Sequence, residues 1–381
     1  MTVRDISPVF ADLVGQQAVV ERLQGAVAGD MTHAWLFTGP PGSGRSNAAV
    51  AFAAALQCEQ GGCGQCHSCH SVSIGAHPDV NVTRTEKLTI GVKEVRELVR
   101  SAALAPAGRR YQVMVVEDAD RLTEQACNAL LKAIEEPNPR TVWLLCAPTV
   151  EDVLPTIRSR TRLVVLATPS SSDVAAFLVS HDQVDQQTAL YAARASQGHI
   201  GRARALARDE DTRRRRRELV RFPVRLTSLG ACMSAATTVH DLAKEEADAI
   251  TAVFDARERE ELDTAYGVVE RGRRPREYGP ALKELEKSQK TRAKRRHLDV
   301  VDRGLMDLVS VYRDALTFQL GARSEIVNEE VRADVDELAR ATTPEENLRR
   351  IDAVFTAREQ MLEFNVPPML ALESLMTALK V

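Results

Sequence analysis

Four cysteines stand close together in the segment CEQGGCGQCHSC. Two overlapping C-x-x-C steps allow backbone N–H groups to face the thiolates, and four sulfurs can then converge as a tetrahedron, the arrangement that Zn²⁺ prefers. Four thiolates leave no open position on the metal, so the pattern predicts a structural zinc site. The predicted ligands are Cys58, Cys63, Cys66 and Cys69.

Free or redox-active thiols are the alternative interpretation of this segment. His67 and His70 lie in or beside it, and we interpret both as surface residues because four cysteines already fill the coordination shell. Cys127, Cys146 and Cys232 lie in apolar patterns and are predicted to be core residues.

The glycine-rich segment GPPGSGRS follows a short apolar run and precedes an alanine-rich stretch. Glycines let backbone N–H groups turn towards a phosphate, and the amino terminus of a following helix adds positive potential. Arg45 stands where such loops usually carry Lys, and its guanidinium is bulkier than an ammonium group. The segment predicts a site for ATP or ADP, with the Ser46 hydroxyl available to Mg²⁺; the alternative is a strand-to-helix turn without a ligand. The candidate nucleotide-binding residues are Gly39, Gly42, Ser43, Gly44, Arg45 and Ser46.

The segment VMVVEDADRL could supply the acidic half of the same site. In a Walker B strand an Asp orders Mg²⁺ and the next residue, Glu, polarises the attacking water. Here the order is reversed, with Glu117 before Asp118. Because a misplacement of about 1 Å can cost about a hundredfold in rate, the reversal predicts poor catalysis. A solvated acidic turn is the alternative.

The elements that must position these residues alternate between strand and helix patterns up to about residue 166. A helical pattern spans 124–136, and such alternation is typical of a parallel sheet covered by helices on both faces. The predicted strands are 33–38, 111–116, 141–146 and 162–166.

The strand signals stop after the segment ATPSSSD, at 167–173. We expect one of the serines 170–172 to cap the next helix. Residues 173 to about 210 read as a small helical unit, and the remainder to Val381 also reads as helical.

Net charge and the distribution of apolar residues restrict the nucleic-acid contacts and the cellular location that the sequence allows. The 381 residues are 44% apolar and carry a formal net charge of -3, so any contact with nucleic acid must come from local basic patches. No amino-terminal stretch resembles a signal peptide, and no apolar run reaches the ~18 residues of a membrane span. We therefore expect a cytoplasmic protein with reduced thiols; the family resemblance described below implies a place in the nucleoid or replisome.

Several segments together resemble one family. They are GQQAVVERL, GPPGSGRS, DADRLTEQACNALLKAIEEPNP and TIRSRT. The combination resembles the AAA+ subunits of the bacterial sliding-clamp loader over residues 10 to 205, and the helical remainder fits the family's collar by position and pattern only. Within the family, the altered Walker residues and the segment GPALKELE are most similar to the delta-prime type of DNA polymerase III subunit found in actinobacteria.

This resemblance implies an α/β AAA+ module, a small helical lid domain and an all-α collar domain for oligomerisation. The AAA+ nucleotide-binding module would span 1–166 with a zinc module at 58–69, the lid 167–212 and the collar 213–381.

The resemblance also implies roles for residues outside the phosphate loop. Arg160 falls on the arginine finger, which stabilises charge on the γ-phosphate in the site of a neighbouring subunit. Ser159 precedes it as in the family, whereas Thr161 replaces the usual Cys. Gln16 falls in the segment that borders the adenine.

Four catalytic positions depart from the family pattern. They are Arg45, the Glu117–Asp118 pair, Ala147–Pro148 at sensor 1, and Gly201 at sensor 2 with Arg202 one step late. Together these changes predict that the chain hydrolyses ATP weakly or not at all, while the intact glycines and Ser46 still allow it to bind nucleotide.

The function expected from this pattern is that of a non-motor clamp-loader subunit. It would cap a pentameric ring, bind the delta and gamma/tau subunits and donate Arg160 in trans, so that the complex loads the beta clamp on primer–template DNA. One alternative is an active motor ATPase of the gamma/tau type, and another is a homomeric AAA+ helicase or remodelling ATPase. No polymerase active site is expected in this chain.

Two basic runs remain without a role at this stage. They are 213–217, which consists of five arginines, and 283–297. Contact with DNA phosphates and a solvated or acid-paired helix face are both consistent with them.

Overall fold

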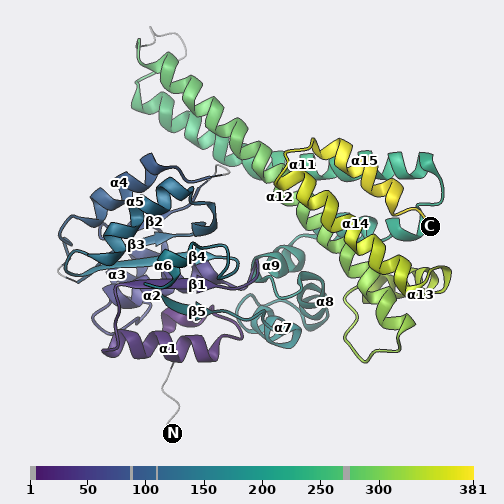
Figure 1. Cartoon of the computed structure of the whole chain (residues 1–381), viewed down its shortest axis with the longest axis horizontal. Helices are drawn as coiled ribbons and strands as arrows, with labels where there is room; N and C mark the ends of the chain where they lie inside the picture. The colour runs from purple at the N-terminus through teal and green to yellow at the C-terminus, as the bar shows by residue number, and fades with distance from the viewer. Residues whose placement is uncertain (1–5, 86–88, 109, 269–274) are drawn as a thin grey trace. The chain divides into compact units, whose positions relative to one another are not determined.

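The computed structural model describes residues 6–85, 89–108, 110–268 and 275–381. The chain separates into two compact units, Met1–Arg208 and Asp209–Val381 (Figure 1). In the described part of the chain, no helix combines the length and apolar character needed to span a membrane.

The first unit is built on a parallel sheet of five strands in the order β2-β3-β4-β1-β5. Every residue of β1, β3 and β4 is buried, which fits their Val- and Leu-rich sequences. The four predicted strands are confirmed within one residue at each end, and the short edge strand β2 adds a fifth. The bounds are β1 Ala34–Thr38, β2 Val80–Thr83, β3 Gln112–Val116, β4 Thr141–Ala147 and β5 Arg162–Val165.

Helices cover both faces of this sheet, as the alternating pattern predicted. Trp35 and Phe37 of β1 pack against Phe52 in one hydrophobic cluster, whereas Leu36 between them joins a separate cluster with Leu130. The first cluster includes residues of α1 and α2, and the second includes residues of α4 and α5. The helices and 3-10 turns of this layer are η1 Pro8–Phe10, α1 Gln17–Ala28, α2 Arg45–Gln57, α3 His67–Ser73, α4 Val92–Ala102, η2 Ala119–Arg121, α5 Glu124–Glu135 and α6 Pro155–Arg158.

Three short helices follow the sheet and share their own apolar cluster, which includes Val174, Leu178 and Leu206. Ser170 caps the first of them, because its hydroxyl accepts a hydrogen bond from the Asp173 N–H at 3.1 Å, as the serine cluster predicted. The three helices are α7 Ser171–Ser180, α8 Gln186–Ser196 and α9 Ile200–Arg208.

All regular secondary-structure elements among the described residues of the second unit are helices. One hydrophobic cluster joins α11 and α12 to the carboxyl-terminal helices, and Figure 1 shows α14 and α15 lying along them. The elements are α10 Glu210–Leu219, η3 Phe222–Val224, α11 Leu229–Ala265, α12 Tyr278–Gln319, η4 Glu329–Val331, α13 Arg332–Ala341, α14 Pro344–Leu362 and α15 Pro368–Ala378.

Most arginines of the run 213–217 form ion pairs with acidic side chains. The Arg216 guanidinium is buried and donates to Asp307 Oδ1 at 3.1 Å, to Asn328 Oδ1 at 2.6 Å and to Glu330. Other arginines of the run pair with acids of their own helix or its cap, as Arg214 does with Asp211 at 2.9 Å. The run therefore helps to hold α10 against α12 and is not an open cationic surface.

Replacing Arg216 with Ala should strongly destabilise the second unit. The substitution leaves buried carboxylate and amide oxygens without their donor, a class of change that costs about 3–5 kcal/mol. Urea unfolding followed by circular dichroism measures the loss. Arg214→Ala, which breaks an exposed pair, is the matched control and should change stability by about 1 kcal/mol or less. Equal effects of the two substitutions would contradict a structural role for Arg216.

Candidate functional site

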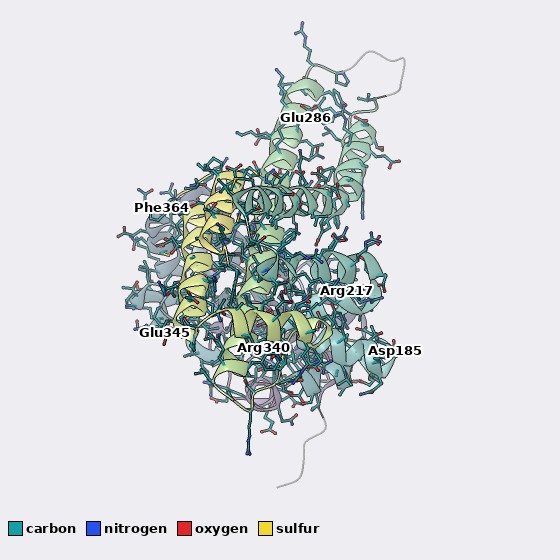
Figure 2. All side chains as sticks on the ribbon, turned by 90° about the vertical axis from the view of Figure 1, so that its right-hand side faces the viewer. Asp185, Arg217, Glu286, Arg340, Glu345 and Phe364 are labelled. Carbon is teal, nitrogen blue, oxygen red and sulfur yellow. The ribbon has the colours of Figure 1, made fainter. Side chains whose placement is uncertain are left out.

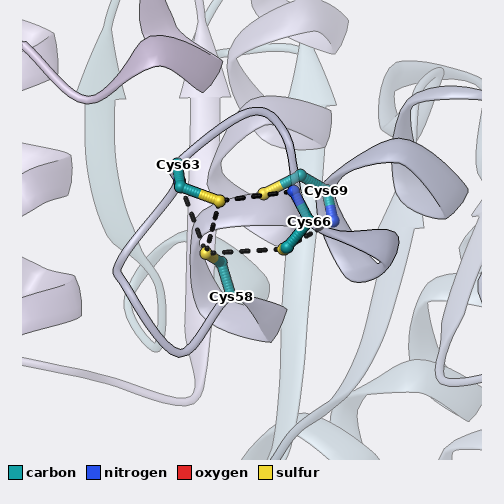
Figure 3. A group of neighbouring side chains, drawn as sticks. All are labelled: Cys58, Cys63, Cys66 and Cys69. Atoms are coloured by element: carbon teal, nitrogen blue, oxygen red, sulfur yellow. Dashed lines mark hydrogen bonds between the residues drawn. The ribbon is translucent and has the colours of Figure 1, made fainter.

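The four predicted zinc ligands converge at one point (Figure 3). All four sulfurs lie within 4.8 Å of one another, with Cys58 Sγ at 3.6 Å from Cys63 Sγ and 3.8 Å from Cys66 Sγ. Tetrahedral coordination with Zn–S bonds of about 2.3 Å places sulfurs about 3.8 Å apart. None of the four is in a disulfide, and the sulfurs are too far apart for one. The cluster therefore has the donor set and the spacing to hold a metal ion.

The backbone prepares these sulfurs for the thiolate form. The N–H groups of Cys63, Cys66 and Cys69 each point at the sulfur of the preceding cysteine of the set, at 3.4, 3.4 and 3.5 Å. Burial opposes ionisation of Cys58, but hydrogen bonds from backbone N–H groups outweigh it and lower the pKa of this thiol to about 6. Burial raises the pKa of Cys69, and the neighbouring Cys58 and Cys66 sulfurs raise it further. A bound cation would favour the thiolate forms of these converging sulfurs.

Two helices carry the cysteine cluster. Cys58 directly follows α2, and Cys66 caps the amino terminus of α3 through its sulfur. His67 and His70 are exposed, as predicted. The three remaining cysteines are buried in apolar surroundings, which confirms that prediction too; they are Cys127, Cys146 and Cys232.

The glycine-rich loop has the backbone geometry of a phosphate cradle. Gly39, Gly42 and Gly44 have φ values of 156°, 84° and 91°, and α2 begins directly after Gly44. Positive φ is readily available only to glycine, so GPPGSGRS can form this turn where other sequences would be strained. The Ser43 hydroxyl is buried and has no partner among the described residues. These are features of a loop shaped to receive an anion.

The loop is nevertheless filled by the protein's own side chains. The Arg45 guanidinium folds back and donates to the Gly39 carbonyl. Burial lowers the pKa of Arg45, although Asp120 and Asp118 oppose the shift. The cation at position 45 is thus hydrogen-bonded to its own loop.

His199, just before α9, lies against the loop. A Cβ built on Gly42 would lie 2.3 Å from His199 Cγ, so the imidazole rests directly against this glycine. His199 Nδ1 accepts a hydrogen bond from the Arg202 N–H at 3.2 Å, which fixes the ring at the start of α9. Sequence reasoning missed His199; its position two residues before Gly201, in the sensor 2 segment, was the available signal.

The reversed acids have separate partners. Glu117 accepts a hydrogen bond from Arg84 Nε at 2.6 Å, and its side chain is 9% exposed. Asp118 Oδ2 accepts from the Thr85 N–H at 3.4 Å, and its charge acts on Arg45. The carboxylate at the metal position is therefore already paired with a cation, Arg84, a residue that the sequence did not single out.

The sensor positions offer little to a γ-phosphate. Ala147 is buried at the end of β4, and the Pro148 carbonyl accepts a hydrogen bond from the Gly39 N–H at 3.1 Å. Gly201 lies in the first turn of α9, against the His199 ring. None of these positions presents a side-chain donor.

Gln16 binds the segment that links β5 to α7. Its amide donates to the Ala167 carbonyl at 2.6 Å and accepts from the Ala167 N–H at 3.2 Å. Close by in the sequence, Asp12 and Leu13 help to line a cavity of about 800 Å³ together with Asn47 of α2. This volume lies in the range of small-molecule sites.

Arg160 lies at the opposite edge of the sheet from the phosphate loop. In the parallel pairing of β5 with β1, Arg162 is level with Trp35, and Val165 is level with Thr38, the last residue before the loop. Three strand residues, about 10 Å, separate these levels, and Arg160 precedes the strand.

The Arg160 side chain is accessible. It is 40% exposed, pairs with Glu135 at 2.8 Å and donates to the Thr156 carbonyl at 2.9 Å and to Ser159 Oγ at 3.0 Å. Ser159 thus orients the guanidinium.

Two family models match this chain. They are "DNA polymerase III, delta subunit" over residues 15–170 and "DNA polymerase III, delta subunit, C terminal" over 299–380. The first covers the sheet and the segment directly after β5, and the second covers most of the helical core of the second unit.

Curated relatives carry the names of two subunit types. DNA polymerase III subunit gamma/tau of Mycobacterium tuberculosis is 40% identical over 158 residues, which is 40% of this chain and 27% of the relative. DNA polymerase III subunit delta' of Escherichia coli is 36% identical over 185 residues, which is 47% of this chain and 55% of the relative. The chain spans only about a quarter to a half of the length of these relatives.

A solved structure, a DNA polymerase III gamma subunit-related protein from Thermotoga maritima, is 16% identical with a TM-score of 0.38, covering 89% of this chain and 98% of that one. The family assignment depends on the sequence matches at both ends of the chain. By these matches, the chain belongs to the family of DNA polymerase III clamp-loader subunits.

Proposed function

We propose that this chain is a non-motor clamp-loader subunit of the delta-prime type, which donates Arg160 to the nucleotide site of a neighbouring subunit. The position of Arg160 carries the proposal. An exposed arginine at the amino edge of the sheet is remote from the loop at the carboxyl edge, so its guanidinium acts on a site in another chain. To do so it exchanges Glu135 for a phosphate, and an exposed ion pair of this kind costs little to break.

The state of the chain's own site supports the same assignment. Arg45 is bonded to Gly39, Glu117 to Arg84, and His199 covers Gly42. Each of these contacts must be displaced before Mg²⁺ and a γ-phosphate could take up a productive geometry. The site is therefore proposed to hold nucleotide weakly and to hydrolyse it poorly, and relatives named delta' support this subunit type.

The second candidate is a motor subunit of the gamma/tau type. The intact glycine loop and the 40% identity to a gamma/tau relative favour it. In either case the proposed partners are the delta and gamma/tau subunits in a ring, with primer–template DNA and the beta clamp reached through the complex. The proposed division of the chain is a nucleotide-binding module at 1–166, a lid at 167–212 and a collar at 213–381.

The metal in the cysteine cluster is proposed to be Zn²⁺. Four soft thiolates with tetrahedral spacing suit it, and such a site is structural because no coordination position stays open. Cys58 and Cys69, both buried, anchor the turn between α2 and α3 to the rest of the module.

The Arg160→Ala variant tests the donated finger. In a complex reconstituted with delta and gamma/tau, it should slow ATP hydrolysis at one neighbouring site about a thousandfold or more, while the subunit still assembles. Single-turnover phosphate release measures the effect. Because each active site contributes to the amplitude of the phosphate burst, the slowed site should reduce that amplitude. Arg158→Ala, an equally exposed arginine two residues earlier, should keep the full burst. A full burst with Arg160→Ala would refute the proposed role.

The isolated chain should release no phosphate from ATP above background. The swapped acids and the occupied loop both remove transition-state contacts, so a titration with labelled ATP and Mg²⁺ should show at most saturable binding without turnover. Phosphate release is followed on the same sample. Turnover that Arg45→Ala abolishes would contradict this expectation and favour the gamma/tau type.

The purified protein should contain one zinc per chain by elemental analysis. Cys66→Ser combined with Cys69→Ser should remove it, because two thiolates no longer close the shell. His67→Ala combined with His70→Ala is the matched control within the same module and should retain the metal. Zinc that survives the cysteine substitutions, or a native protein without zinc, would disprove the assignment. The affinity of the cluster for zinc should decrease as the pH is lowered, because the thiols become protonated.

A further inference from the structure

Part of the α11–α12 hairpin extends beyond the hydrophobic core of its unit. We call residues 248–268 and 275–297 the arm; Figure 1 shows it as two helices side by side, away from α13 to α15. The core cluster includes Ala247 and Leu298 but none of the described residues between them. The family models also leave this segment unmatched, since the second begins at residue 299. The arm thus lies within the stretch 171–298 that neither family model covers.

Polar contacts, together with an edge-to-face contact between the Tyr266 and Tyr278 rings, join the two helices of the arm. Only three of its described residues are buried: Thr251, Tyr278 and Arg292. Arg292 bridges to Asp255 at 2.6 Å and to Glu258 at 2.8 Å, and the Tyr278 hydroxyl donates to Asp263 at 2.5 Å. These contacts use acids of α11 on the side that faces α12.

The opposite side of α12 carries a row of lysines. Lys283, Lys287, Lys290 and Lys294 are spaced by four, three and four residues, which places them on one helical stripe about 16 Å long. Lys283 is nine residues from Arg292, and at 100° per residue that is half a turn away from the side that meets α11.

The row is an open cationic surface. All four lysines are exposed, and none forms an ion pair with a residue that the structure describes. The nearby Glu286, labelled in Figure 2, pairs with Arg259 of α11 at 3.6 Å. Residues 283–297 carry seven Lys or Arg against two Glu, and one of the seven, Arg292, is paired with acids of α11. The arginine run 213–217 is different, because acids neutralise most of it.

The chemistry of the row fits a phosphate backbone better than a protein surface. Protein interfaces are depleted in lysine and need an apolar centre, whereas the positions beside the row are Thr291, Ala293 and Glu286. Aromatic side chains, which would stack on bases, are absent from the row, so no base preference is expected. A rigid helix presents its ammonium groups in a straight line, and one strand of a duplex offers about five phosphates over 16 Å.

We propose that the lysine row of the arm binds the backbone of duplex DNA without sequence preference. The surface is distinct from the phosphate loop and from Arg160, and the proposal holds for either subunit type. It gives the chain its own electrostatic contact with DNA despite its net charge of -3.

Binding of the full-length chain to a fluorescein-labelled 30-base-pair duplex tests the proposal. Fluorescence anisotropy is recorded from about 30 to 200 mM NaCl on two unrelated sequences. The test variant replaces all four lysines of the row with Gln. Because each lost phosphate contact lowers the slope of log K against log[salt] by about 0.9, the slope should fall by about 3 to 4 units, equally for both sequences.

A control of equal charge separates the row from bulk electrostatics. Four exposed arginines elsewhere in the second unit are replaced with Gln: Arg214, Arg323, Arg340 and Arg349. This control should keep the native slope, and circular dichroism should show native helicity for both variants. Equal losses in the two variants, or no DNA binding by the native chain, would overturn the proposal. It also fails if the lysine variant binds DNA normally but no longer associates with gamma/tau, since the row would then serve an acidic protein surface.

Discussion

The parallel register of the sheet is the constraint on which the chemistry of this chain depends. With β1 bonded to β4 and β5 in the same direction, everything that follows a strand meets at one edge and everything that precedes a strand meets at the other. The phosphate loop and the acids therefore share one edge, and Arg160 belongs to the other. The same hydrogen bonds that stabilise the sheet thus keep the glycine-rich loop and Arg160 at opposite edges.

Arginine side chains illustrate how environment decides the role of one residue type. Arg45 is bound within its own loop, Arg216 is buried among carboxylates, and Arg292 holds two helices together. Arg160 alone of these four is substantially exposed, with a single ion pair that solvent weakens. A guanidinium is always charged, so its availability depends on how many acceptors surround it and on how deeply they are buried.

The second unit combines two ways of holding helices together. Near its base, α12 buries Leu305, Leu308 and Tyr312 in a continuous apolar core. In the arm the same helix turns an analogous face to solvent and lines it with lysine, and contact with α11 passes through arginine, tyrosine and acids. Such contacts specify the pairing of two helices without creating an apolar patch that would invite aggregation.

The sequence by itself determined the fold class, four of the five strands, the cysteine set and the family, because glycine turns, thiol spacing and buried aliphatic runs are local patterns with few alternative meanings. It did not single out β2 at the sheet edge, where three of the four residues are only partly buried and the sequence signal is weak. Only the tertiary structure showed that His199 lies against Gly42 and that Arg84 forms an ion pair with Glu117. It also showed that acids neutralise most of the run 213–217, whereas the lysines of 283–297 are exposed. These outcomes depend on residues brought together from distant parts of the chain, and which cation meets which acid is decided by packing that no local spacing records.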